Sequence, residues 1–382
     1  MKMTSRERFL TAMTGGVPDR VPCTPDFSNM IPCRLTGKPF WDIYLHNDPP
    51  LWRAYIDAAN HFGVDAWFFN GALDYEYRAG PQASWESRIV SRSDERIVQR
   101  TRISTPEGEL EHETTYSRDN PPTQTAGPIK DFQKQFTFFK YLMRPPTGYR
   151  TDTARQQKQY VGPDHAFGAA IGFPGFQWWM NDLNGKMEAM AAALADCPEL
   201  LDELRDMQEK AILKQAEMII DSKLYDYVLL GGSGAITLAS PALFDRYAFP
   251  TIQKLTRMFK QAGIATMLHS CGKEMHIVRR CAQDSDLDCI NPLEIAPMGD
   301  CELGQVKRLY GDRIALMGNL HTTDVMLRGT VEQVKAAARQ AIDDAAAGGG
   351  FILSTGDQCG RDTPEGNIFA LVETAQDYGR YA

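Results

Sequence analysis

Short apolar segments recur along the chain, and each of them ends in polar or glycine-rich residues. Segments of this length, bounded by turn residues, are typical of buried strands. Eight of them predict strands over residues 21–27, 66–70, 166–172, 227–231, 265–269, 289–292, 314–318 and 350–354. The stretches between carry apolar residues at helical spacing with charged faces between them. They predict helices over 198–222, 241–262, 273–282, 303–310, 330–347 and 364–378.

The alternation of predicted strands and helices indicates a parallel sheet, because parallel neighbours need a crossover connection. Eight such units close naturally into a barrel, so we expect an α/β protein in which residues 1–382 form one (β/α)8 TIM-barrel domain. A doubly wound open sheet is the alternative, but the chain has no GxGxxG turn to support it. Thr4 and Glu7 fit the capping box of a short helix before the first strand.

One region near the end of the N-terminal third breaks the alternation. Residues 88–91, 96–104 and 109–117 have an extended pattern, and a Pro-Glu-Gly turn at 106–108 joins the last two. The loop over 118–128 is rich in proline and threonine. We interpret residues 80–145 as an inserted β-hairpin that covers the barrel mouth. A surface meander without a functional role is the alternative.

Composition excludes several classes of protein. Of 382 residues, 43% are hydrophobic and 24% charged, with a net charge of −8, and no basic stripe indicates a nucleic-acid partner. No run of about 18 apolar residues predicts a membrane span, and the early charges at the N-terminus do not fit a signal peptide. The eight cysteines are irregularly spaced and form no CxxC pair, which is unlike a disulfide framework. We therefore expect a cytoplasmic protein.

The strongest chemical signal lies at the end of the fifth predicted strand. His269 and Cys271 are two residues apart, so an extended chain points both side chains to the same side. A second cysteine, Cys359, lies just past the eighth strand, and Glu294 follows the sixth. Because all strand ends of a barrel meet at one face, these residues can converge there. Imidazole, thiolate and carboxylate are the ligands of zinc, so we predict a metal site. An HxC pair that arose by chance is the alternative.

Other polar residues at predicted strand ends are weaker candidates for binding a substrate: Asp26, Asn29, Asn70, His165, Asn319 and His321. A histidine in such a position is more often a structural residue. Asn319 also fits the cap of the turn that follows it.

Three segments resemble the uroporphyrinogen decarboxylase superfamily. Residues 310–320, with the sequence YGDRIALMGNL, are similar to its "G…ALQGNLDP" segment. Residues 348–351 followed by 362–367 are similar to its closing "GGGFIL…TPPEN" segment, and residues 4–8 with 18–22 are similar to its N-terminus. The resemblance covers nearly the whole chain and implies the barrel fold. The decarboxylase's arginine-rich "RQAGRY" segment is replaced here by TPDFSN over 24–29, which speaks against a substrate with many carboxylates.

The resemblance is better to the corrinoid-linked methyltransferases of this superfamily, whose zinc motif HxC…C is reproduced by His269, Cys271 and Cys359. The order His, Cys, Glu, Cys is also similar to the zinc set of cobalamin-independent methionine synthase, which makes Glu294 a fourth candidate. The resemblance implies a zinc enzyme that works with a separate corrinoid protein, because the chain lacks a DxHxxG motif of its own. It also implies that two copies can pair.

Two methyl-transfer roles fit the resemblance. In the first, the enzyme moves a methyl group from a small O-methyl donor, such as a methoxylated aromatic, to cob(I)alamin, with zinc acting on the leaving oxygen. Trp178 or Trp179, just after the third predicted strand, would then stack on the donor. In the second, the enzyme methylates a thiol such as coenzyme M. A decarboxylating lyase and a non-catalytic binding protein are the remaining alternatives. We favour the first because the predicted insert suits a selective pocket.

Overall fold

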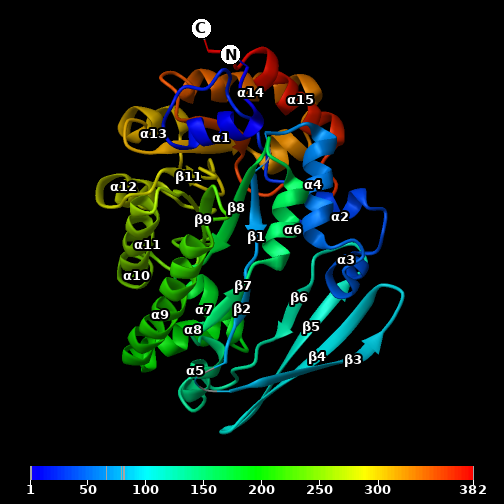
Figure 1. The fold of residues 1–382 in the computed structure, drawn as a ribbon, viewed down its shortest axis with the longest axis vertical. Coiled ribbons are helices and arrows are strands. Elements are labelled where there is room, and N and C mark those ends of the chain that lie inside the picture. Colours follow the sequence, from blue (N-terminus) through cyan, green and yellow to red (C-terminus); the bar gives the residue numbers. More distant parts are fainter. Residues whose placement is uncertain (1, 66, 79, 81, 382) are drawn as a thin grey trace.

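Seven parallel strands form the centre of the computed structural model, which describes residues 2–65, 67–78, 80 and 82–381 (Figure 1). Neighbours in the sheet follow one another in the order β1, β8, β9, β10, β11, β12 and β13. Their bounds are Trp67–Gly71, Ala166–Ile171, Tyr227–Gly231, Ala265–His269, Cys289–Asn291, Ala315–Leu320 and Phe351–Thr355. The predicted strands after the first are thus confirmed, although residue 66, where the second was expected to begin, lies outside the described residues.

The first predicted strand, over 21–27, is not a regular strand, but it occupies the eighth position of the barrel. Cys23 forms a parallel bridge with Leu353 of β13, and its carbonyl accepts a hydrogen bond from the backbone N–H of Asp65 at 2.9 Å, just before β1. Pro22 and Pro25 have no backbone N–H to donate, so a continuous ladder cannot form here. The segment nevertheless joins the two edges of the sheet into a TIM-barrel-like fold.

Helices that follow the strands cover the outside of the barrel, and further helices precede β1 or lie between β1 and β8. They are α1 Ser5–Met13, α2 Met30–Leu35, α3 Phe40–His46, α4 Leu51–Phe62, α5 Phe139–Leu142, α6 Asp152–Val161, α7 Phe176–Asp182, α8 Lys186–Asp196, α9 Pro198–Ser222, α10 Pro241–Tyr247, α11 Phe249–Gln261, α12 Met275–Asp284, α13 Leu303–Tyr310, α14 Val331–Ala345 and α15 Glu365–Asp377. A 3₁₀ turn at Phe136–Phe138 and a π-helix at Thr322–Leu327 complete the set. The single helix expected over 241–262 is divided, because Pro250 lacks the N–H that a continuous helix needs.

Alternate residues of each strand face opposite sides of the sheet. Leu230, Leu268 and Leu316 pack outward against the helices, whereas Tyr227, Met267 and Met317 fill the barrel interior. Helix α1 closes the N-terminal end of the barrel, and its Phe9 ring lies 5.5 Å from that of Tyr227. The capping box predicted for this helix is confirmed. Helix α1 therefore blocks the barrel interior at this end, and the opposite end is the one where the strands terminate.

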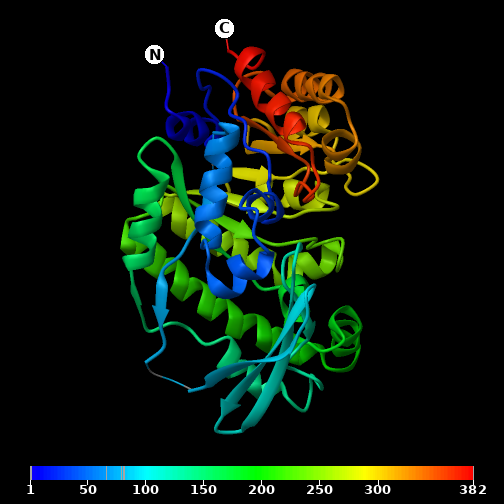
Figure 2. The same cartoon turned by 90° about the vertical axis from the view of Figure 1, so that its right-hand side faces the viewer.

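The insertion between β1 and α6 forms two small antiparallel sheets. β2 (Asp74–Glu76) pairs with β7 (Gly148–Arg150), and β3 (Ser84–Arg92), β4 (Arg96–Thr105), β5 (Gly108–Ser117) and β6 (Thr123–Ala126) form a four-stranded sheet. Its buried side packs with α7, α8 and the start of α9. Figures 1 and 2 show this sheet at the end of the molecule away from α1 and both termini. That it covers a substrate stays a prediction.

None of the helices in the described part of the chain is long and apolar enough to cross a membrane.

Asp65 holds the closure of the barrel together. Its buried carboxylate lies 2.7 Å from Nη1 of Arg8 and 2.7 Å from Nη1 of Arg20, and it accepts a hydrogen bond from the backbone N–H of Cys23 at 3.1 Å. Helix α1, the 21–27 segment and the start of β1 are therefore linked through one side chain.

We expect Asp65→Asn to lower the free energy of unfolding by about 3–5 kcal/mol, because Arg20 would lose its paired carboxylate and the buried Arg8 would keep only that of Asp19. Chemical denaturation followed by circular dichroism measures this. Glu373→Gln, which removes a surface ion pair with Lys335, is the control and should have little effect. An Asp65→Asn protein as stable as the control would contradict the role assigned to this carboxylate.

Candidate metal centre

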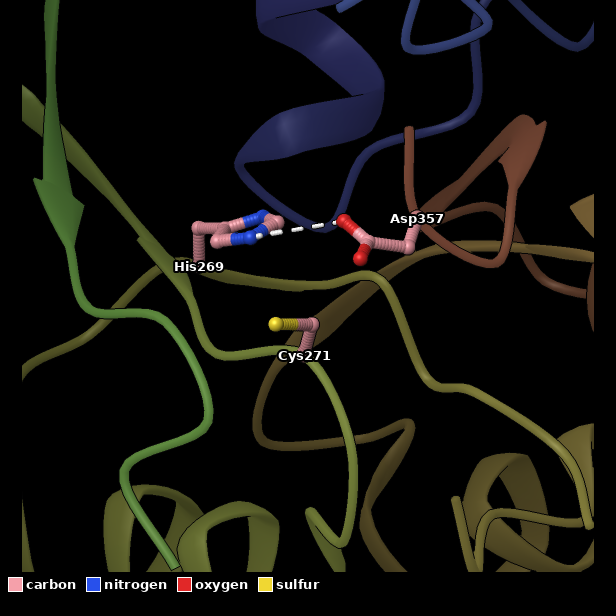
Figure 3. A group of neighbouring side chains, drawn as sticks. All are labelled: His269, Cys271 and Asp357. Carbon is pink, nitrogen blue, oxygen red and sulfur yellow. Dashed lines mark ion pairs between the residues drawn. The ribbon is translucent and has the colours of Figure 1, made fainter. Parts of the chain in front are cut away.

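Three side chains with metal-binding atoms converge at the C-terminal end of the barrel. His269 is the last residue of β10, Cys271 follows two residues later, and Asp357 follows β13. One ligand atom from each lies within 4.8 Å of the other two. His269 and Asp357 point towards one another, with Nε2 and Oδ1 3.7 Å apart, and the Cys271 side chain lies beside them (Figure 3). The prediction named Cys359 as the ligand from the loop after the eighth strand, whereas among the described residues the set within 4.8 Å contains Asp357 of that loop and not Cys359.

The parallel register explains this placement. His269 is opposite Gly231 of β9 and Asn291 of β11, so all three lie at the same level of the barrel. Met267 lies two residues earlier in the same strand and faces the barrel interior, so the side chain of His269 points to that side as well. Past His269 the chain turns at Gly272, whose φ of 85° favours glycine and whose Cβ position would be 2.1 Å from Oγ1 of Thr237. This turn holds the Cys271 thiol next to the imidazole.

The electrostatics of this group fit a bound cation. Burial and, to a smaller extent, the charge of Asp357 raise the pKa of Cys271 to about 11, and a hydrogen bond with Ser233 Oγ at 3.2 Å opposes this shift. Oδ1 of Asp357 is buried and has no hydrogen-bond partner among the residues that the structure describes, and Asp357 has a φ of 124°. An unsatisfied carboxylate oxygen in a strained backbone is costly unless something compensates it. Imidazole, thiol and carboxylate together match the ligand types of zinc.

Glu294 lies next to this group. Its Oε2 accepts a hydrogen bond from the backbone N–H of Gly272, directly after Cys271. Burial raises the pKa of its carboxyl group above the ordinary value. The predicted fourth ligand therefore belongs to the same neighbourhood, although within the described chain the 4.8 Å set consists of His269, Cys271 and Asp357.

Two buried side chains position the loop that carries Glu294. Leu293, the preceding residue, has a φ of 61°, which is unfavourable for a leucine. Its N–H donates to Oε2 of the fully buried Glu274 at 2.8 Å, and its carbonyl accepts from Nδ2 of Asn319 at 2.9 Å. Both polar groups of this strained residue are thus satisfied by side chains from other elements. Asn319 supports the loop through its amide nitrogen, and its role as a substrate contact stays a prediction.

Cys359 is fully buried on the loop after β13, two residues beyond Asp357. Burial raises the pKa of its thiol to about 12, and the charge of Asp26 adds to the shift. The backbone N–H of Cys359 donates to the carbonyl of Asp26 at 2.8 Å. Burial also raises the pKa of the Asp26 carboxyl group to about 6, against the opposing influence of His269. Cys359 and Asp26 therefore flank the same end of the barrel.

The remaining predicted residues divide into those near this end and those elsewhere. Asn70 lies in β1, one residue before its end, and Asn29 precedes α2. His165 precedes β8, so it lies at the opposite end of that strand and not with His269. The predicted strand over 166–172 also begins after His165, so its place at a substrate-binding strand end stays a prediction that this position does not favour. His321 accepts hydrogen bonds through Nδ1 from the N–H groups of Thr323 and Asp324, which makes it a helix cap.

The two tryptophans have different roles. Trp179 is fully buried, and its Nε1 donates to Gln208, so it belongs to the core between the insertion and the barrel. Trp178 is 38% exposed. A Cβ at Gly172 or at Gly231 would lie 3.5 Å or 3.9 Å from its indole ring, which places the ring over the ends of β8 and β9. Gly231 is the register partner of His269, so Trp178 is close to the metal-binding group.

Sequence reasoning missed Asp357 and Glu274. Asp357 stands two residues before Cys359 and directly after a predicted strand, so a search for any carboxylate at strand ends would have found it. Glu274 gives no such signal, because an acidic residue before a helix is usually an exposed cap. Its burial depends on the packing of α12 against the β11 loop.

Comparison with known proteins identifies relatives that match about half of the chain. The chain is 27% identical to the methylcobamide:CoM methyltransferase MtaA of Methanosarcina barkeri over 180 residues. These residues make up 47% of this chain and 50% of the relative. It is 26% identical over 183 residues to the methylcobamide:CoM methyltransferase MtbA of Methanosarcina mazei, 47% of this chain and 49% of the relative. The matched region thus spans about half the length of these curated relatives.

A solved structure shares the whole fold. A methyltransferase from Methanosarcina mazei aligns over 98% of this chain and 99% of its own, with a TM-score of 0.66 and 19% sequence identity. A family model described as uroporphyrinogen decarboxylase (URO-D) matches residues 180–378, which include His269, Cys271, Glu294 and the loop after β13. Because this match covers more than half of the chain, the protein belongs to the uroporphyrinogen decarboxylase (URO-D) family.

Proposed function

We propose that this protein is a zinc-dependent methyltransferase that moves a methyl group from a small O-methyl donor to the cob(I)alamin of a separate corrinoid protein. The observation that carries the proposal is the convergence of His269, Cys271 and an acidic loop at the C-terminal end of the barrel. The names of its relatives, which include methylcobamide:CoM methyltransferases, support the transfer of methyl groups to or from a corrinoid.

His269 and Cys271 are proposed as two of the zinc ligands, and the third comes from the loop after β13. The resemblance assigns this place to Cys359, whereas Asp357 is the residue of that loop whose oxygen lies beside His269. Glu294 is proposed as the fourth ligand. The hydrogen bond that it accepts from the N–H of Gly272 would hold its carboxylate close to Cys271. When bound, the zinc ion would supply Lewis acidity toward the oxygen that leaves the methyl group.

The residues of the chain would prepare this site in three ways. Ser233 Oγ lies 3.2 Å from the Cys271 sulfur, and this hydrogen bond opposes the rise in the pKa of that thiol, which favours the thiolate that a metal needs. Glu274 and Asn319 hold the Leu293 peptide, so that Glu294 enters the site with its main chain already fixed. Trp178 offers a half-exposed aromatic face over the neighbouring strand ends, on which an aromatic donor can stack.

Methylation of a thiol is the second candidate, and the relatives named as CoM methyltransferases favour it. The same ligands would hold the thiol as thiolate next to zinc. The exposed aromatic side chain of Trp178 favours the O-methyl donor instead, since a small aliphatic thiol gains little from it.

An assay of methyl transfer separates the two. The zinc-loaded protein is incubated with a reduced corrinoid protein and a panel of methoxyarenes, or with methylcobalamin and coenzyme M, and the absorbance of the corrinoid is followed. Methylation of the corrinoid by a methoxyarene is expected. Turnover only with coenzyme M would support the second candidate, and no turnover in either assay would reject both.

Substitution by Co²⁺ tests the ligands directly, because sulfur-to-cobalt charge transfer increases with the number of thiolate ligands. Cys271→Ser is expected to weaken cobalt binding by more than about 100-fold, since loss of a supporting group alone costs about 10–100-fold. Cys359→Ser is expected to halve the charge-transfer band, and Asp357→Asn to leave it unchanged. If Cys359→Ser leaves the charge-transfer band unaltered and Asp357→Asn weakens cobalt binding, the third metal ligand is Asp357. A wild-type protein that binds neither cobalt nor zinc would reject the metal site.

Substitution of Trp178 tests the aromatic donor. We expect Trp178→Ala to raise KM for a methoxyarene about 10-fold, because an aromatic pair contributes about 0.5–1.5 kcal/mol beyond the area that it buries. Trp178→Phe keeps an aromatic face and should stay within about threefold of the wild type. Steady-state kinetics at saturating corrinoid protein measures both variants. Equal KM values for the alanine and phenylalanine variants would show that stacking does not contribute.

A further inference from the structure

Strand β3 is an open edge of the four-stranded sheet. It pairs with β4 on one side only, and all nine residues of Ser84–Arg92 are exposed. The opposite edge of the same sheet is covered, because Gln124 of β6 donates to the carbonyl of Asn181, and Ile129, three residues after β6, forms a bridge with Leu183. Figure 1 shows β3 as the outermost strand, on the side away from β6. A long strand with unpaired N–H and C=O groups is a template for another strand.

The buried face of the sheet continues onto β3 without being covered there. Ile103 and Thr101 of β4 are 2% and 6% exposed. Trp85 is the register partner of Ile103, and Ile89 follows on the same face, yet these two are 48% and 47% exposed. Apolar side chains on the core-facing side of an edge strand are unusual, because edges are normally protected by charge or by covering segments.

The charges of β3 are arranged with two-fold self-complementarity. In an antiparallel pair of two β3 strands centred on Ser87, Glu86 stands opposite Arg88 of the second copy, and Arg88 opposite its Glu86. Trp85 then stands opposite Ile89 on the core-facing side. Within the described chain, no ion pair or hydrogen bond engages the side chain of Glu86 or Arg88, so both are available. A shift by two residues in either direction would place Glu86 opposite Glu86, or Arg88 opposite Arg88, which is unfavourable.

We infer that β3 pairs with β3 of a second copy of this chain, joining the two inserted sheets into one eight-stranded sheet. The contact is isologous, since the same strand serves both copies around a two-fold axis through Ser87. Backbone hydrogen bonds along the edge supply the attraction, the Trp85–Ile89 pairs cover the exposed part of the core face, and the Glu86–Arg88 pairs set the register. The inference does not depend on the proposed methyl transfer.

Charge reversal provides the test, with the mass of the full-length protein measured by sedimentation velocity and by light scattering. The wild type is expected to be a dimer at about 10 μM. Glu86→Arg places arginines opposite one another and Arg88→Glu places glutamates, so each single variant is expected to be a monomer. The double variant restores opposite charges and should be a dimer, and a mixture of the two single variants should form a heterodimer.

Arg92→Glu is the matched control, because it changes an exposed charge of the same strand that stands opposite Gln82 in this register. It is expected to leave the dimer intact. Ser87→Cys gives a second measurement: two cysteines on the axis should form an intermolecular disulfide under mild oxidation, whereas Glu86→Cys should not. Circular dichroism and thermal melting confirm that each variant is folded.

A wild type that is monomeric at this concentration would overturn the inference. So would a dimer that both single charge reversals leave intact, since the interface would then lie elsewhere. A dimer disrupted by Arg92→Glu but not by Arg88→Glu would show that β3 pairs in another register, and would overturn the pairing of Glu86 with Arg88.

Discussion

Closure of the parallel sheet is the constraint on which the rest of this structure depends. The gap between β13 and β1 is filled by a proline-containing segment that makes one bridge, to Leu353. A single carboxylate, that of Asp65, ties this segment to Arg8 of α1 and to the start of β1. Because the sheet is closed, the ends of β10 and β13 face one another across the barrel mouth, and His269 meets Asp357. In an open sheet these two strand ends would diverge.

The candidate site is held by buried polar groups that act on the backbone. The loop after β11 contains a leucine in a left-handed conformation, and the side chains of Glu274 and Asn319 satisfy its two peptide groups. Glu294 follows at once and contacts the N–H beside Cys271. Strain of this kind persists only where surrounding contacts over-determine the conformation. A site assembled in this way needs little reorganisation when a cation or a substrate arrives.

The sheet of β3 to β6 makes contacts through one face and leaves one edge free. One side packs with α7, α8 and α9, next to the segment that carries Trp178, and so links the insertion to the barrel mouth. The free edge at β3 carries exposed apolar residues together with charges of both signs. The same insertion therefore connects the proposed substrate pocket with the proposed contact between two copies of the chain.

The sequence by itself determined the barrel, seven of its strands, the first helix with its capping box, and the position of His269 and Cys271 at a strand end. These features depend on periodicity and on neighbouring residues, which a sequence displays directly. Proline residues in the sequence also indicate the break of a predicted helix before Pro250 and the irregular segment at 21–27. Neither feature was predicted. Only the tertiary structure decided that Asp357 faces His269, that Glu274 is buried beneath the Glu294 loop, and that β3 has an open edge. Each of these depends on contacts or strand limits that are set by packing between distant segments, and no local pattern encodes them.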